Sequence, residues 1–159
     1  MADEGSTGAP AEARTAAEDG ALREVVAAEH AAVWGYGVVG AALAPADRAS
    51  AVGAENAHRD VRDRLAALLD QRGRDSVPAQ AAYQLPFPVL SAVDAAALAV
   101  VLESGASTAW VALLDDAVDA STRALAVQEL GAAEVRAVGW RTAAGQTPTT
   151  TPFPGLPTD

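Results

Sequence analysis

Cysteine and lysine are both absent from the 159-residue sequence. Without cysteine the chain can form no disulfide, no thiolate metal site and no thiol nucleophile. Aromatic residues make up only 4% of the chain. No uninterrupted run of about 18 apolar residues occurs, which argues against a membrane-spanning helix. The sequence therefore points to neither sulfur chemistry nor a membrane anchor.

Positive charge is scarce as well. The formal net charge is −10, and the basic residues are arginines scattered along the chain. Because phosphate contacts require a basic patch, we expect no nucleic-acid partner. The chain also lacks the polybasic segment that binds anionic lipid, so we expect no membrane partner. The first 20 residues are acidic and have neither the basic nor the apolar region of a secretory signal, so we expect a cytoplasmic protein.

Alanine is what the chain has in abundance. Half of the residues are apolar, and many of these are alanine, the strongest helix former. Hydrophobic periodicity predicts four helices, at about 20–44, 47–72, 91–114 and 119–143. The first two are expected to end at Pro45 and Gly73. We therefore divide the chain into a flexible acidic tail (1–19), a helical bundle (20–145) and an extended proline-rich tail that docks on the bundle (146–159).

The longest connection lies between the second and third predicted helices. Prolines at positions 78, 86 and 88 exclude a regular helix there. The connection is long enough to cross a bundle from end to end, so these two helices could run parallel. The predicted fold is all-α, a ferritin-like four-helix bundle with a long proline-rich crossover between helices two and three.

The periodic pattern also places residues on faces. On the fourth helix it puts Leu125, Gln128, Ala132, Val135 and Gly139 on one face, and Glu129, Arg136 and Trp140 on the neighbouring one. In the proline-rich tail, we expect Phe153 and Leu156 to pack on the bundle.

Acidic residues occur on or beside the apolar stripe of every predicted helix. Ferritin-like di-iron proteins use one Glu from each of two helices and a Glu-x-x-His pair from each of the other two. The candidate metal ligands in this sequence are Glu29, Glu55, His58, Glu103 and Glu129. Glu55 and His58 form a literal Glu-x-x-His, whose spacing puts both side chains on one helical face.

The fourth helix departs from that pattern, because Ala132 stands where a full site would have histidine. The alternative interpretation is that these carboxylates and His58 form ion pairs at the edge of the core. Arg59, Arg62, Arg136 and Arg141 are the arginines available for such pairs.

Several unusual segments occur in one order along the chain: AAEHAAVWGYGVVGAAL, AHRDVRDRL, AYQLPFPV, LESGASTAWVALL, VRAVGWR and PFPGLP. Over about residues 20–157 the sequence resembles an actinobacterial ferritin-like domain family of unknown function. The resemblance implies the ferritin-like fold and no established activity or metal site.

Three functional hypotheses follow. The first is a non-enzymatic binding or interaction protein. We expect a homodimer, because exposed Ala and Gly faces suit helix association, and the sequence leaves open whether another protein also binds. The alternative is a degenerate di-metal carboxylate protein with oxidase or iron-handling activity, with iron or another divalent metal as its cofactor. A third is an enzyme that uses Glu29 and His58 as an acid/base pair. The sequence does not decide whether the protein is an enzyme.

Overall fold

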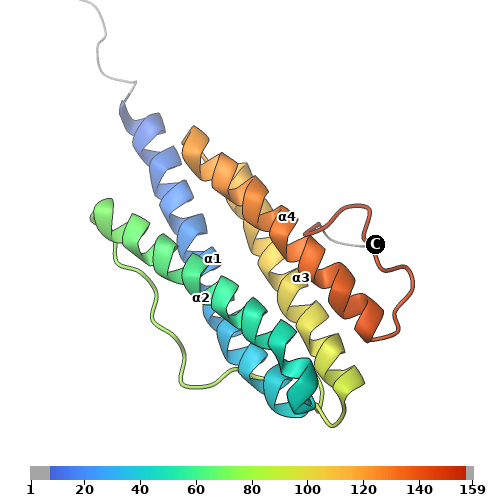
Figure 1. Cartoon of the computed structure of the whole chain (residues 1–159). Helices are drawn as coiled ribbons and strands as arrows, with labels where there is room; N and C mark the ends of the chain where they lie inside the picture. Colours follow the sequence, from blue (N-terminus) through green and yellow to red (C-terminus); the bar gives the residue numbers. More distant parts are fainter. Residues whose placement is uncertain (1–7, 157–159) are drawn as a thin grey trace, which may run out of the picture.

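The computed structural model describes residues 8–156 (Figure 1). It contains four α-helices and one short 3₁₀ helix, and no strand occurs within this range. The elements are α1 (Gly8–Ala42), η1 (Pro45–Asp47), α2 (Arg48–Gln71), α3 (Ala92–Asp116) and α4 (Ala120–Ala143). The prediction of an all-α chain with four helices is confirmed.

The helices form two antiparallel pairs, α1 with α2 and α3 with α4 (Figure 1). The pairs are joined because α1 also packs against α3. In Figure 1, α2 and α3 run in the same direction, and the connection between them returns along the outside of α1. Its contacts with α1 include Arg23 Nε to the Asp75 carbonyl at 2.8 Å and the Trp34 and Tyr83 rings, whose centroids are 5.7 Å apart. The backbones are therefore close on three sides of the bundle, whereas α2 and α4 are more widely separated and meet through side chains of the core.

Local sequence explains where the helices begin and end. Pro45 follows α1 and starts η1, because the residue before proline avoids helical geometry. Gly73, just after α2, has φ +67°, which suits glycine at a helix C-terminus. Ser91 caps α3 by accepting a hydrogen bond from the Asp94 backbone N–H at 3.1 Å, and Ser91 Oγ donates to the Asp94 carboxylate at 2.8 Å.

The beginning of α1 corrects the predicted boundary at residue 20. The helix extends from Gly8, and Glu18 and Asp19 are buried. Arg72, at the end of α2, donates to Glu18 at 2.6 Å and to Asp19 at 2.9 Å. Glu18 also accepts from the backbone N–H of Asp119 at 2.9 Å, just before α4. The local composition predicts a tail because it does not contain the partners that bury these acids, which lie far away in the sequence. Residues 1–7 of the predicted tail fall outside the described range.

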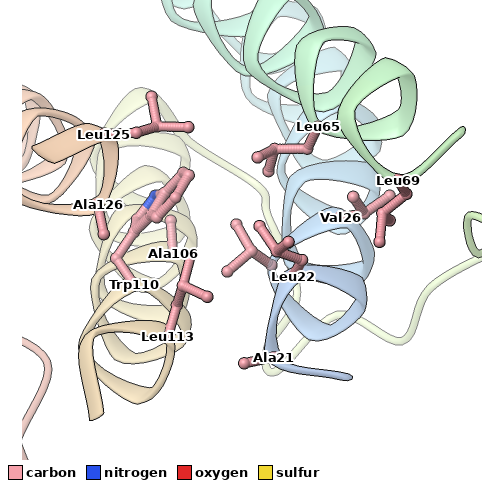
Figure 2. Close-up of a cluster of buried hydrophobic side chains, with 11 residues drawn as sticks. Ala21, Leu22, Val26, Leu65, Leu69, Ala106, Trp110, Leu113, Leu125 and Ala126 are labelled. Carbon is pink, nitrogen blue, oxygen red and sulfur yellow. The ribbon is translucent and has the colours of Figure 1, made fainter. Parts of the chain in front are cut away.

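Two apolar clusters fill the interior. One gathers around Trp110 with Leu22, Leu65 and Leu125, and Figure 2 shows side chains from all four helices directed into it. The other gathers around Tyr36 and Trp140. The core thus has two halves, one toward each end of the bundle.

The buried face of α4 differs from the face that the apolar pattern grouped with Leu125. Val135 is 76% exposed, whereas Ala126, Ala133 and Ala137 are fully buried. Small side chains allow α3 and α4 to approach closely, so alanine occupies the contact and valine faces outward. In an alanine-rich helix, apolar pattern alone does not identify the packed face.

The C-terminal segment lies along α3 and α4. Arg141 donates to the Thr149 carbonyl at 3.3 Å. Gly155, with φ +78°, approaches the α3 backbone so closely that a Cβ would lie 2.5 Å from the Ser107 carbonyl oxygen. Phe153 is 69% exposed, so the expectation that it packs on the bundle is wrong. Leu156 is 51% exposed and lines a cavity beside Ser104 and Thr108 of α3, so for this residue the expectation holds in part. The Thr149 backbone carbonyl and Gly155 make the contacts with α4 and α3.

Two helical stretches, Pro10–Ala42 and Ala92–Asp116, are long and apolar enough to span a membrane by length and composition alone. The core helix of a soluble protein meets the same criterion. Both stretches contribute to the two apolar clusters.

Candidate functional site: a buried ion network

Each of the four helices contributes one polar side chain at the level between the two apolar clusters. These are Glu29 from α1, His58 from α2, Glu103 from α3 and Arg136 from α4. The first three are at most 1% exposed. Burial of so many ionisable groups is costly unless they are paired, so their contacts decide what the site can do.

His58 lies between the two carboxylates. Its Nδ1 is 2.6 Å from Glu29 Oε2, and its Nε2 is 3.3 Å from Glu103 Oε1. Both ring nitrogens therefore face acceptors, an arrangement that only the doubly protonated imidazolium satisfies with two donors. The Tyr36 ring stacks on His58, with 5.4 Å between the ring centroids.

Glu103 is the centre of the network. Its Oε1 accepts from Tyr36 Oη at 2.5 Å and from Arg136 Nε at 2.8 Å, in addition to the contact with His58. Its Oε2 is buried and has no hydrogen-bond partner among the described residues. One oxygen is thus over-supplied with donors while the other is unsatisfied.

The electrostatics of the network are balanced. Burial acts to lower the pKa of His58, but the hydrogen bonds to Glu103 and Glu29 outweigh it and raise the pKa to about 9. Burial acts to raise the pKa of Glu103, but His58 and Arg136 outweigh it and hold that pKa below its usual value. Burial, followed by the negative charge of Glu103, raises the pKa of Tyr36, which stays a hydrogen-bond donor. At neutral pH two carboxylates therefore face two cations.

The structure brings three of the five predicted ligands together and leaves two apart. Glu29, His58 and Glu103 form the network. Glu55 pairs with Arg59 at 2.5 Å, and both side chains are partly exposed. Glu129 accepts a hydrogen bond from its neighbour Gln128 at 3.1 Å. The Glu-x-x-His pair is separated because α2 directs His58 into the core and Glu55 toward solvent.

The contacts of these side chains are those of ion pairs rather than of ligands around a shared metal ion. Glu29 and Glu103 contact opposite nitrogens of His58, so the three groups do not converge on one point as metal ligation demands. The guanidinium of Arg136 is already bound to Glu103 and adds positive charge beside it. Within residues 8–156 no cluster of three or more His, Asp or Glu side chains has a geometry suited to holding an ion.

The sequence predicts the ion pairs of the network only in part. Arg136 was among the arginines expected to pair with the acids, and the Glu103 pair bears this out. The hydrogen bond from Tyr36 to Glu103 was not anticipated, because an aromatic residue on an apolar stripe is usually core. Its position seven residues after Glu29, on the same helical face, was the available signal.

Two grooves open between α2 and α4. The Arg64 groove, of about 320 Å³, includes Leu68, Thr122 and Leu125 in its lining. The Arg136 groove, of about 300 Å³, is lined by Ser50, Ala54, Val135, Arg136, Gly139, Trp140 and Ala143. Neither groove is lined by Glu29, His58 or Glu103.

This arrangement defines an all-α protein whose four helices meet at a buried, charge-balanced network. Residues 21–158 match the family model described as "Domain of unknown function (DUF4439)", and the chain belongs to that family. It is also similar to the crystal structure of a conserved hypothetical protein, rv2844, from Mycobacterium tuberculosis. The two share 38% sequence identity with a TM-score of 0.77, over 80% of this chain and 96% of that one. No curated protein matches the chain.

Proposed function

We propose that this chain is a non-enzymatic binding protein of ferritin-like architecture that acts through the face between α2 and α4. The observation that carries the proposal is the open fourth side of the bundle, where both grooves lie. Ligand sites are concave and mostly apolar, with a few polar groups, and the Arg136 groove has this character. Two antiparallel helix pairs joined by one long connection support the ferritin-like assignment.

The state of the buried network favours binding over acid/base catalysis. A general base must come within hydrogen-bond reach of a substrate proton. Glu29 and His58 are 1% exposed and occupied by each other. The network therefore stabilises the fold, and the Arg136 groove beside it is accessible to a ligand.

Titration of the ¹⁵N-labelled protein with indole, a neutral apolar probe, tests this proposal. We expect saturable shifts of the Ala54 and Ala143 amide signals, since both residues line the groove. Gly139→Leu should abolish them by filling the Arg136 groove, because a Cβ at this position meets no atom within 4 Å. Gly131→Leu, at an equally open position of α4 outside the groove, is the matched control. Indole shifts that survive Gly139→Leu, or that scatter over the surface, would contradict the proposal.

The alternative, a degenerate di-metal protein with oxidase or iron-handling activity, has one observation in its favour. Glu103 Oε2 is a buried carboxylate oxygen without a hydrogen-bond partner among the described residues, and such an uncommitted oxygen is suited to coordinating a cation. Metal analysis of protein from iron-supplemented cells, with an Fe(II) oxidation assay, separates the two functions. A stoichiometric metal that is lost in Glu103→Gln would favour the alternative.

The homodimer, a further protein partner and the cytoplasmic location stay predictions. Val127 and Val135, two exposed apolar side chains of α4, support association through this helix. Light scattering on wild type and Val135→Arg measures the oligomeric state, and cell fractionation measures the location.

A further inference from the structure

Arg136 places a positive charge at one end of the Arg136 groove. The guanidinium is bound through Nε to Glu103, and its two terminal nitrogens have no hydrogen-bond partner among residues 8–156. The side chain is 23% exposed and lines the groove. Five donors in a rigid fork make arginine well suited to bidentate carboxylate recognition. A fixed cation with free donors therefore lies at one end of an otherwise largely apolar surface.

The groove continues toward the end of the bundle. Ser50, Trp140 and Ala143 line both this groove and a neighbouring cavity of about 390 Å³ beside η1 and the start of α3. Along α4, Arg136 to Ala143 spans about 10 Å, comparable with an extended eight-carbon chain. The far cavity contains one carboxylate, Asp47. A bound anion would avoid Asp47 and place its head at Arg136.

Resting on the proposed function, we infer that the Arg136 groove binds a small free carboxylic acid with an apolar chain. The carboxylate pairs with the terminal nitrogens of Arg136, and the chain lies over Trp140 and between Ala54 and Gly139. The Nε bond to Glu103 holds the guanidinium in place, which lowers the entropy cost of binding.

Net charge makes this inference selective. The protein carries a formal charge of −10, so long-range electrostatics repel an anion. A preference for an anionic over a neutral ligand of the same length can then come only from a local cation. Comparison of octanoate with 1-octanol isolates that contribution.

Isothermal titration calorimetry of the full chain at pH 7.5 with monomeric octanoate and 1-octanol tests the inference. Because a hydrogen bond to a charged group is worth about tenfold or more in affinity, we expect octanoate to bind about tenfold more tightly. Arg136→Gln should equalise the two ligands. Since that variant also disturbs Glu103, Gly139→Leu provides a second test that leaves the network intact and should weaken both ligands, whereas Gly131→Leu should weaken neither.

The outcomes separate this inference from the proposed function. Equal binding of octanoate and octanol, both lost in Gly139→Leu, overturns the carboxylate assignment and leaves the groove as a binding site. Octanoate that binds equally well to wild type and Gly139→Leu overturns the inference, because the ligand then lies elsewhere. If octanoate fails to bind while indole binds in the groove, only the inference falls. If neither probe binds, both fall. Binding to anionic phosphatidylglycerol vesicles without binding of octanoate also overturns it.

Discussion

Neutralising Glu103 is the perturbation that best tests the buried network. The substitution Glu103→Gln keeps shape and removes one negative charge. His58 and Arg136 would then be two cations facing Glu29 as the single remaining carboxylate. Removing one partner of a buried ion pair costs about 3–5 kcal/mol, because the other charge stays buried without compensation. We expect a loss of this size in the free energy of unfolding.

Urea denaturation at pH 7 measures the loss. With a denaturant slope of about 2 kcal/mol per molar for a domain of this size, the midpoint should fall by about 2 M. Glu55→Gln is the matched control, because Glu55 also pairs with an arginine but at the partly exposed surface. An exposed i,i+4 pair contributes only about 0.3–0.5 kcal/mol, so this midpoint should hardly move.

The opposite result would refute the balanced network. Crowded carboxylates that lack a counter-ion raise each other's pKa, and neutralising one of them relieves the repulsion. Glu103→Gln would then leave the metal-free protein as stable as wild type or more stable. That outcome would also favour the metal alternative, because carboxylates without a counter-ion are crowded in this way at a carboxylate metal site.

Four further perturbations test other parts of the structure. His58 has a pKa of about 9 in the folded protein against 6.5 in the unfolded chain. Its protonation therefore contributes about 3 kcal/mol to the free energy of unfolding below pH 6.5, and this contribution is lost as pH rises through 9. The urea midpoints at pH 6.5 and 9.5 should differ less in His58→Gln than in wild type. Glu18→Gln should lower the free energy of unfolding in urea by about 3 kcal/mol, since it removes a negative charge from a buried ion cluster at the start of α4. Glu24→Gln, at an exposed position of α1, should lower it little. Gly155→Ala should detach the C-terminal segment by clashing with the α3 backbone, which limited proteolysis detects while the urea midpoint barely changes. Gly131→Ala, in open space on α4, should stabilise by about 0.5–1 kcal/mol in the same assay.

Much of the helical framework could be predicted because its signals are local. Pro45, Gly73 and the Ser91 cap end or begin helices through contacts within a few residues. Glu29 and Glu103 were identifiable as candidate site residues because each interrupts an apolar stripe at helical spacing. A charged residue in such a position must find a buried partner, and both do.

The features that sequence missed depend on distant partners. Glu18 and Asp19 belong to the folded bundle because Arg72, more than fifty residues away, neutralises them. Glu55 lies only three residues before His58, yet a modest rotation of α2 decides which of the two enters the core. That rotation is fixed by how α2 packs on α1, which no window of the α2 sequence contains.

The two polar clusters explain how the fourth side of the bundle can stay open. Apolar side chains on neighbouring helices tend to close against each other, because burial removes apolar surface from water. However, Arg72 ties the end of α2 to Asp119 and Thr122 at the start of α4, and Glu103 binds both His58 of α2 and Arg136 of α4 at mid-height. Hydrogen-bonded ions have a fixed geometry, and sliding either helix by one turn, about 5.4 Å, would leave buried charges unpaired. The clusters therefore set the separation of α2 and α4 at two levels, and each groove lies beside one of them, because Thr122 and Arg136 are among the lining residues.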